Sequence, residues 1–400
     1  MIRLASISDI LAILSIVEDA RQFLKKTGSD QWQGKDGYPN ETNFLQDIQN
    51  QILYVFESNN HVVGVAAISH YMDENYAKIE DGEWISNRKP YIVIHRLAVK
   101  KEYLQHGIAQ QIFFFAETIA REKGCGSIRV DTHRLNTSMQ KLLSKMNFQR
   151  CGTIYLNGIH DVTHHRFAYE KKIENILNGI KAIIFDMDGT MIDSMKSWYD
   201  TGEQVFKEFF ADDDVDIHRD LENMSAWELA FRIFDKKHDY DKKELFTKRW
   251  NGLMFDRYFR SVHLLPGCRE FLKYLRLKNI RLCIATGTNT SLAIPALKSL
   301  NIFDDFEFIL TEDMVGLSKH HPAIFEQAIA RLKLDKSQCL VFEDSYHSAA
   351  TAKKMGLSVV GVYDEASAKN SAKLKFYAHD FCYSYFDYLA KLKADDSSTF

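Results

Sequence analysis

The sequence predicts an α/β protein with two domains: a mixed α+β sheet domain, then a doubly wound parallel-sheet domain with a small helical cap. The chain has 400 residues, which is more than one hydrophobic core usually organises. Strands and helices alternate after Lys181, as they do in a parallel sheet with helices on both faces. The first strand of that part, 182–185, is apolar at every position, which is typical of a strand buried on both faces.

Composition excludes several classes of protein. The chain has 46% hydrophobic and 26% charged residues, and its formal net charge of -3 gives no field that attracts nucleic acid or anionic membranes. Six scattered cysteines without a Cys-x-x-Cys pair are typical of a reduced cytoplasmic protein. The N-terminus lacks the basic start of a signal peptide, and no apolar run is long enough to cross a bilayer. We therefore expect a cytoplasmic protein with small-molecule partners, no nucleic acid and no membrane, and the oligomeric state stays open.

Hydrophobic periodicity predicts a mixed sheet in the first domain. Helices are expected where apolar residues recur every three or four positions, and strands where short runs are rich in β-branched residues. Asn59-Asn60 between two such runs is a hairpin signal. The expected elements are strands at 2–5, 52–57, 61–69, 91–99, 127–133, 152–156 and 165–170, and helices from residue 8, at about 40–51, at 107–123 and at 138–145.

A polar stretch at 171–179 marks the expected domain boundary. We expect the first domain at 1–172, a linker at 173–180 and the second domain at 181–390. Within the second domain, 195–263 has helical periodicity, many aromatic residues and no clear strand, so it is expected to form the cap. The remaining strands of this domain are expected at 281–285, 306–310, 338–342 and 358–362.

Two carboxylates follow the first apolar strand of the second domain, at the edge where parallel sheets bind ligands. These are Asp186 and Asp188, and Gly189 then permits a tight turn. One carboxylate of such a pair can attack phosphorus while the other exchanges a proton with the leaving oxygen. Because two anions repel a phosphate, a divalent cation is needed, and hard oxygen ligands suit Mg2+.

Three later strand ends carry further candidate groups. Thr286 can donate a hydrogen bond to a phosphate oxygen, and Lys319 offers a cation for charge that develops on the phosphoryl group. Glu343 and Asp344 form a second carboxylate pair, which suits the rest of a Mg2+ shell.

These four motifs, in this order, resemble the haloacid dehalogenase (HAD) superfamily over about 181–388, in the subgroup of β-phosphoglucomutase and small-molecule phosphatases. The resemblance implies that Asp186 is the nucleophile, which forms an aspartyl-phosphate, and that Asp188 is the general acid/base. It implies that Thr286 and Lys319 bind the phosphoryl group and that the insert is a cap that sets specificity. The implied Mg2+ ligands are Asp186, Asp188 (through its backbone carbonyl), Glu343 and Asp344.

The motifs leave the reaction of the second domain partly open. A phosphatase acting on a small phosphorylated metabolite and a phosphosugar mutase share all of these residues. The acid/base Asp188 argues against a dehalogenase, which does not need it. Ala323 departs from the acidic residue usual in the family after the motif proline, and this bears on loop packing more than on chemistry.

A glycine-bearing turn before a long helix marks a candidate site in the first domain. The turn, 105–110, follows the strand that ends at Val99. Unpaired backbone N–H groups at a helix start, beside the positive end of the helix dipole, form a site for a pyrophosphate. Asn136 follows just before the next helix and Phe148 soon after that helix, and together they complete the pattern.

Together these residues resemble the GNAT N-acetyltransferase family over about 2–172. The resemblance implies that the strand amides hold the pantetheine arm and thioester of acetyl-CoA, that the turn cradles its pyrophosphate, and that Asn136 steadies its far end. It places the amine acceptor beside Gln31-Trp32 and Gly37-Tyr38-Pro39. The implied cofactor-binding residues are Leu97, Ala98, Val99, Gln105, His106, Gly107, Ile108, Ala109, Gln110 and Asn136.

Three positions depart from the GNAT pattern. Leu104 removes a side-chain contact, Leu143 replaces a tyrosine that serves as general acid, and Asn147 replaces a glycine. Tyr155 or water would then protonate the thiolate. His95, beside the thioester site, is a candidate base, with a histidine hydrogen-bonded across the sheet as the alternative.

The sequence therefore predicts a bifunctional enzyme: an acetyl-CoA-dependent N-acetyltransferase joined to a Mg2+-dependent phosphatase. A non-catalytic module that binds acyl-CoA and regulates its neighbour stays the alternative for the first domain. His160, His164 and His165 lack a Cys or Glu to complete a metal site, so we expect a polar hairpin there.

Overall fold

The structure is a computed structural model of the whole chain, and it describes residues 2–35, 37–70, 73–156, 164–210 and 226–397. Contacts between residues divide the chain into two compact units. The first comprises residues 1–178 with 375–381, and the second comprises residues 179–374 with 382–400.

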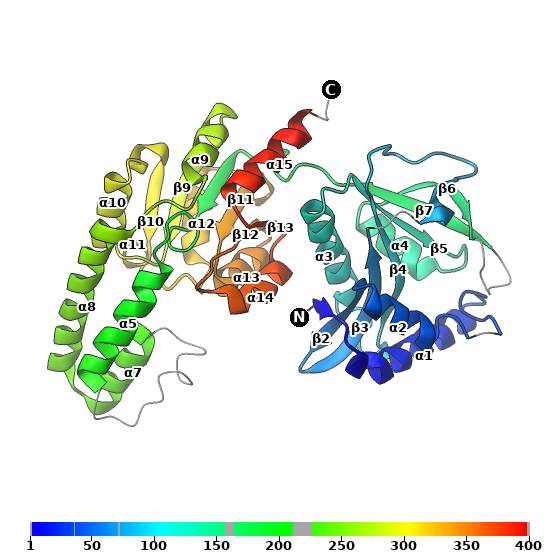
Figure 1. Cartoon of the computed structure of the whole chain (residues 1–400), viewed down its shortest axis with the longest axis horizontal. Coiled ribbons are helices and arrows are strands. Elements are labelled where there is room, and N and C mark those ends of the chain that lie inside the picture. Colours follow the sequence, from blue (N-terminus) through cyan, green and yellow to red (C-terminus); the bar gives the residue numbers. More distant parts are fainter. Residues whose placement is uncertain (1, 36, 71–72, 157–163, 211–225, 398–400) are drawn as a thin grey trace. The chain divides into compact units, whose positions relative to one another are not determined.

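The first unit is built on a seven-stranded mixed sheet with the order β1-β2-β3-β4-β5-β7-β6 (Figure 1). Only the pair β4–β5 is parallel among the pairings of this sheet that the structure describes. The strands are β1 (Ile2–Leu4), β2 (Leu53–Ser58), β3 (His61–Ser69), β4 (Ile92–Val99), β5 (Ser127–Thr132), β6 (Gln149–Tyr155) and β7 (His165–Lys172). The helices are α1 (Ile10–Lys26), α2 (Glu41–Gln49), α3 (Ile108–Glu122) and α4 (Thr137–Lys145).

Helices cover both faces of the first sheet because its central strands are apolar on both sides. In β3, Ala66 and Ile68 pack in the cluster with α3 and α4, whereas Val65 and Ala67 pack in the cluster with α1 and α2. The period of two along a strand sends neighbouring side chains to opposite faces, so each face has its own core. The expected turn between β2 and β3 is present, with positive φ at Asn59 (50°) and Asn60 (61°).

A six-stranded sheet with the order β10-β9-β8-β11-β12-β13 organises the second unit, and only residues 380–381 of its last strand are grouped with the first unit. The pairs β10–β9, β9–β8, β8–β11 and β11–β12 are parallel, as the alternation of strands and helices predicts. The strands are β8 (Ala182–Phe185), β9 (Arg281–Thr286), β10 (Phe308–Thr311), β11 (Cys339–Glu343), β12 (Ser358–Val362) and β13 (Asp380–Cys382). The helices of this part are α9 (Cys268–Leu277), α10 (Thr290–Ser299), α11 (Glu312–Val315), α12 (Ala323–Leu332), α13 (Tyr346–Lys354), α14 (Ser371–Tyr377) and α15 (Tyr385–Ser397).

A helical insert follows β8 and forms the cap. It consists of α5 (Met195–Phe210), α7 (Ala226–Lys237) and α8 (Tyr240–Ser261), which pack against one another (Figure 1). Two short segments join the cap to the sheet domain, and they are hydrogen-bonded to each other. Asp193 N–H donates to the carbonyl of His263 at 2.9 Å, and Leu265 N–H donates to the carbonyl of Met191 at 2.8 Å. The insert therefore begins and ends at one hinge.

The predicted fold class, a mixed-sheet domain followed by a doubly wound parallel-sheet domain, is confirmed. β13 was not predicted, because Asp380–Cys382 is too short to show a period. His160 and its predicted hairpin turn lie outside the described residues, while β6 and β7 on either side are antiparallel. Among the described helices, none has both the length and the apolar character that crossing a membrane requires.

Two candidate active sites

The loop after β8 places the first carboxylates of the second domain. Asp186 directly follows the strand, and its N–H donates to Phe342 of β11 at 2.9 Å, so the chain leaves the sheet at a fixed point. Gly189 has φ +73°, and a Cβ there would lie 2.5 Å from Oδ2 of Asp344. Glycine is therefore required both for the turn and for the approach of Asp344.

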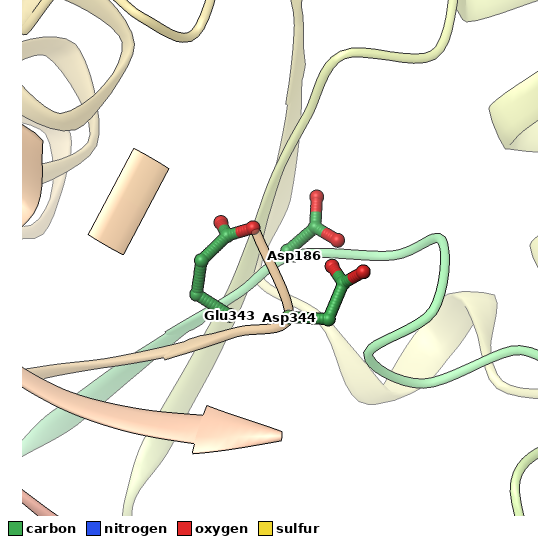
Figure 2. A group of neighbouring side chains, drawn as sticks. All are labelled: Asp186, Glu343 and Asp344. Carbon is green, nitrogen blue, oxygen red and sulfur yellow. The ribbon is translucent and has the colours of Figure 1, made fainter. Parts of the chain in front are cut away.

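Three carboxylates converge at the carboxyl ends of β8 and β11. Ligand atoms of Asp186, Glu343 and Asp344 all lie within 4.8 Å of one another, and Figure 2 shows the side chains from the two strands meeting at one point. Lys319 Nζ lies 2.5 Å from Asp186 Oδ1 and 2.6 Å from Glu343 Oε2. Thr190 Oγ1 donates to Asp344 at 3.2 Å. One ammonium thus pairs with two of the three clustered carboxylates.

This charge balance favours a bound cation. Asp186 is 6%, Glu343 1% and Asp344 6% exposed, so water screens their charges poorly. Burial raises the pKa of Asp344 well above its usual range, and the charges of Asp186 and Glu343 raise it further. Burial also raises the pKa of Glu343 to about 7, although Lys319 opposes the shift. Hard carboxylate oxygens that repel one another are a donor set that fits Mg2+.

Asp188 lies apart from this cluster and is bonded to four donors. Its Oδ2 accepts from Thr288 Oγ1 at 2.5 Å. Its Oδ1 accepts from Ser194 Oγ at 2.6 Å, from Trp198 Nε1 at 3.1 Å and from the hydroxyl of Tyr258. Trp198 belongs to α5 and Tyr258 to α8, so the cap itself contacts the candidate acid/base.

The residues predicted for the second site therefore come together in two groups. The first group meets at one buried point and consists of Asp186, Lys319, Glu343 and Asp344. Thr286 and Asp188 form the second group through Thr288: Thr286 is fully buried at the end of β9, and its hydroxyl accepts the N–H of Thr288 at 3.1 Å. The carboxylate of Asp188 faces Thr288 and the cap instead, so any metal contact would use its backbone carbonyl. Sequence reasoning missed the four donors to Asp188 because they come from separate segments, two of them in the cap, that only tertiary packing brings together.

The candidate site of the first domain opens where two strands separate. β4 and β5 pair only at Ile92–Ile128 and Val93–Arg129, after which β4 runs on without β5. Arg96 has φ 53°, at the register shift against β3. Backbone groups of residues 94–99 therefore lack β5 as a partner. They line a cavity of about 760 Å3 together with residues 130–132 of β5.

The turn before α3 has the backbone form expected of an anion site. Gln105 (φ 67°) and Gly107 (φ 77°) adopt left-handed conformations, and Gly107 is the N-cap residue. Because glycine has no side chain with which to cap the helix, the N–H groups of the first turn stay available to a ligand. Leu104 and Ala109 line the cavity beside this turn.

His95 lies in the cavity between two carboxylates. Its Nε2 lies 3.0 Å from Asp73 Oδ2 and its Nδ1 lies 3.9 Å from Asp131 Oδ1. Tyr76, which is fully buried, donates its hydroxyl to Asp131 at 2.6 Å. Burial by itself raises the pKa of Asp73, but the hydrogen bonds from His95 and Asn75 and the charge of His95 together outweigh it and leave this pKa lowered. In the neutral form of the imidazole, a donor bond from Nε2 to Asp73 makes Nδ1 the basic nitrogen.

Several residues predicted for the acceptor side do line the cavity, namely Gln31, Trp32 and Tyr38. Asp47, which pairs with Arg96 at 2.7 Å, also lines it. Sequence reasoning missed Asp47, Asp73 and Asp131 because they come from three separate segments that only the sheet brings together.

Other predicted residues of the first domain have additional or different surroundings. Asn136 lines the cavity, but its Oδ1 accepts the N–H of Met139 at 3.2 Å and caps α4. Leu143, at the position of the missing tyrosine, is fully buried in the core. Tyr155 is 45% exposed, stacks on His164 and is not among the described residues that line the cavity.

Comparison with known proteins assigns each half to a family. Residues 17–148 match the Acetyltransferase (GNAT) family, and residues 183–362 match the Haloacid dehalogenase-like hydrolase family. The (DL)-glycerol-3-phosphatase 2 of Arabidopsis thaliana is 30% identical over 194 residues, which cover 46% of this chain and 80% of that protein. The β-phosphoglucomutase of Bacillus subtilis is 29% identical over 194 residues, which cover 46% of this chain and 83% of that enzyme.

A crystal structure from Streptococcus agalactiae, described as an acetyltransferase of the GNAT family, is similar to the first half. It is 34% identical, and the match covers 43% of this chain and 94% of that chain with a TM-score of 0.39. The two family matches fall in separate parts of the chain, which therefore joins two enzyme domains. It belongs to the GNAT acetyltransferases through its first domain and to the haloacid dehalogenase-like hydrolases through its second, as the sequence motifs predict.

Proposed function

We propose that the chain is a bifunctional enzyme, which transfers an acetyl group from acetyl-CoA to a small-molecule amine and removes phosphate from a small phosphorylated metabolite. The observation that carries the phosphatase half is the buried convergence of Asp186, Lys319 and Asp344 at the sheet edge. The observation that carries the acetyltransferase half is His95 between Asp73 and Asp131 in the cavity where β4 leaves β5. The cytoplasmic location stays a prediction of the sequence.

Asp186 and Asp344 would hold Mg2+, with Glu343 beside them and the backbone carbonyl of Asp188 as a further ligand. The bound ion would neutralise the carboxylates and the phosphate oxygens that face them. Lys319, which is held by Asp186 and Glu343, supplies the remaining positive charge for the phosphoryl oxygens.

The chemical steps of the phosphatase belong to the two aspartates. An oxygen of Asp186 attacks phosphorus in line with the leaving group, and the P–O bond to the leaving group breaks as an aspartyl-phosphate forms. Asp188 gives its proton to the leaving oxygen. It then takes a proton from the water that attacks the aspartyl-phosphate, which restores Asp186 and releases phosphate. Thr286 positions the phosphoryl group through its hydroxyl.

The phosphatase proposal is tested with Asp186→Asn, assayed on an aryl phosphate with Mg2+. We expect turnover to fall at least a thousandfold, and undiminished turnover would refute the assignment of the nucleophile. The similar proteins include both a phosphatase and a β-phosphoglucomutase. Product analysis with hexose phosphates separates these reactions, since free phosphate identifies a hydrolase and an isomerised hexose phosphate identifies a mutase.

In the acetyltransferase half, Nδ1 of His95 removes a proton from the bound ammonium group of the acceptor. The resulting imidazolium lies between Asp73 and Asp131, and both carboxylates stabilise its charge. The neutral amine attacks the thioester carbonyl and the C–S bond breaks. The proton that the amine nitrogen loses as the amide forms passes through water to the thiolate of CoA. The amides of Leu97 and Val99 and those of the turn at 105–110 hold the cofactor.

His95→Gln separates this enzyme from a module that only binds acyl-CoA. We expect acetyl transfer, measured across a panel of amines, to fall about a hundredfold, the low end of a general base's usual contribution, while the affinity for CoA stays the same. CoA binding without acetyl transfer by the wild type to any amine would favour the regulatory module. The observation that favours this second function is that Leu143, which stands at the position of the usual general-acid tyrosine, is fully buried.

A further inference from the structure

The cap supplies two donors to the carboxylate of Asp188. The indole N–H of Trp198 is shared between Asp188 Oδ1, at 3.1 Å, and the hydroxyl oxygen of Tyr258, at 2.8 Å. The Tyr258 hydroxyl in turn donates to the same Oδ1. Tyr258 is 2% exposed, so this bond to the carboxylate is shielded from water.

These donors fill one oxygen of the carboxylate. A carboxylate oxygen has two lone pairs, and Asp188 Oδ1 accepts from Ser194, Trp198 and Tyr258, whereas Oδ2 accepts from Thr288. No lone pair of Oδ1 is left for the leaving oxygen of a substrate or for an attacking water. At least one donor has to withdraw before Oδ1 can exchange a proton.

The cap donors are the ones placed to withdraw. Ser194 and Thr288 belong to the loops of the sheet domain, whereas Trp198 is on α5 and Tyr258 is on α8. Both cap residues lie about one helical turn from the hinge, where Asp193 and His263 pair. A small rotation of the cap about this hinge therefore moves both donors together relative to Asp188.

We propose that Trp198 and Tyr258 are positioning residues that hold Asp188 until a substrate binds, and that the leaving group of the substrate then accepts their hydrogen bonds in place of Asp188. This exchange selects phosphate esters whose leaving groups carry hydroxyls. This inference rests on the proposed phosphatase function. Once Asp188 turns to the ester oxygen, the indole N–H and the phenol O–H are buried donors without an acceptor, which is costly. Hydroxyl oxygens on the leaving group can accept these bonds. An alkyl leaving group cannot, so it is turned over more slowly.

Two esters of the same carbon skeleton test the proposal. Glycerol 3-phosphate and n-propyl phosphate differ by two hydroxyl groups and present a similar reacting bond. With the full chain and Mg2+, we expect the wild type to have a kcat/KM at least tenfold higher for glycerol 3-phosphate. Tyr258→Phe and Trp198→Phe each remove one donor and should lower this ratio at least threefold, mainly by raising kcat/KM for n-propyl phosphate.

Tyr240→Phe is the matched control, because Tyr240 begins the same helix and is 61% exposed. It should leave both rates unchanged. A ratio that persists in both Tyr258→Phe and Trp198→Phe overturns the proposal, and so does an equal loss of activity on both esters, which would indicate a structural role only. Equal turnover of the two esters by the wild type overturns the proposed selection of hydroxylated leaving groups but leaves the proposed phosphatase function intact. Turnover of neither ester refutes both.

Discussion

Lys319 Nζ lies 2.5 Å from Asp186 Oδ1, although the two residues are 133 positions apart in the chain. Both side chains are buried, and the same ammonium also lies 2.6 Å from Glu343. Burial lowers the pKa of a lysine, but the charges of Asp186 and Glu343 outweigh this and leave the pKa of Lys319 raised. The parallel sheet thus brings a cation from one loop to the nucleophile that follows another strand.

Lys319→Met should therefore affect both stability and activity of the second domain. Removing one partner of a buried ion pair leaves carboxylates uncompensated, and we expect a loss of about 3 kcal/mol in the free energy of unfolding. Phosphatase activity should fall at least a hundredfold. Hydrogen exchange of the amides in β8 and β11 measures the stability of this domain by itself.

The exposed Lys336 provides the control for this substitution. Lys336→Met removes the same charge from a solvated position and should change neither exchange nor activity. If the amides of β8 and β11 exchange as slowly in Lys319→Met as in the wild type, the ammonium of Lys319 does not stabilise the buried carboxylates.

Without a bound cation, the second domain should become less stable as the pH rises from about 5 to about 7.5. Burial raises the pKa of Glu343 from 4.5 to about 7. A raised carboxyl pKa contributes stability that is fully present below the unfolded value and is lost as the pH passes the folded value. Asp344 shifts in the same direction, whereas the contribution of Lys319 stays constant because its pKa lies far above this range.

Urea unfolding in EDTA at several pH values measures this dependence. Glu343→Gln cannot ionise and should flatten the slope, and saturating Mg2+ should raise stability most at the upper end of the range, where the carboxylates are charged. A midpoint that rises with pH in EDTA would contradict the assignment of a buried, repelling cluster.

The sequence predicts most of the fold because its patterns are local. The apolar run Ala182–Phe185 and the strand Ser358–Val362 are found at the predicted bounds. The hairpin at Asn59-Asn60 follows from residues that tolerate positive φ. Asp380–Cys382 forms a strand because it pairs with the edge of the sheet, and no local sequence pattern indicates this pairing.

The candidate sites were predictable where one residue follows one strand end. Asp186 and Asp344 each follow a parallel strand directly, and the edge of the sheet then brings them together. Asp73 and Tyr258 lie in a loop and in the cap helix α8, and their partners His95 and Asp188 come from other elements. Such pairs depend on tertiary packing, so the sequence contained no signal for them.

Arg129 should be a main support of the first sheet. Its guanidinium lies 4.1 Å from the ring centroid of Trp84 and 3.9 Å from that of Tyr91, and its Nε lies 2.9 Å from Glu170. Glu170 is fully buried and also accepts from Ser127 at 2.6 Å. Arg129→Met keeps the apolar stem but leaves the buried carboxylate of Glu170 without a cationic partner. We therefore expect a loss of about 3 kcal/mol in the free energy of unfolding.

A double-mutant cycle isolates the ion pair from the rest of the packing. The double variant Arg129→Met with Glu170→Gln should recover part of the stability that Arg129→Met loses, because no buried charge is left unpaired. Thermal unfolding of the four proteins measures the coupling. Strictly additive losses would mean that the rings alone stabilise the guanidinium.

Asn136 has two roles to separate, the N-cap of α4 and the predicted contact with the cofactor. Its Oδ1 accepts from Met139 N–H at 3.2 Å, and its amide donates to Gln31 Oε1 at 3.3 Å inside the wall of the cavity. Asn136→Ala removes both groups, so the first domain should lose about 1 kcal/mol of stability and bind CoA more weakly. Asn136→Asp keeps a capping oxygen at the helix start and should be about as stable as the wild type.

The aspartate variant then isolates the effect on the cofactor. A carboxylate in the cavity wall repels the anionic cofactor and cannot donate to it, so calorimetry should show CoA binding about tenfold weaker, the equivalent of about 1.4 kcal/mol. If Asn136→Asp binds CoA as tightly as the wild type while Asn136→Ala binds it more weakly, then the cap and not the amide determines affinity. In that case the residue acts on the cofactor only by fixing the position of α4.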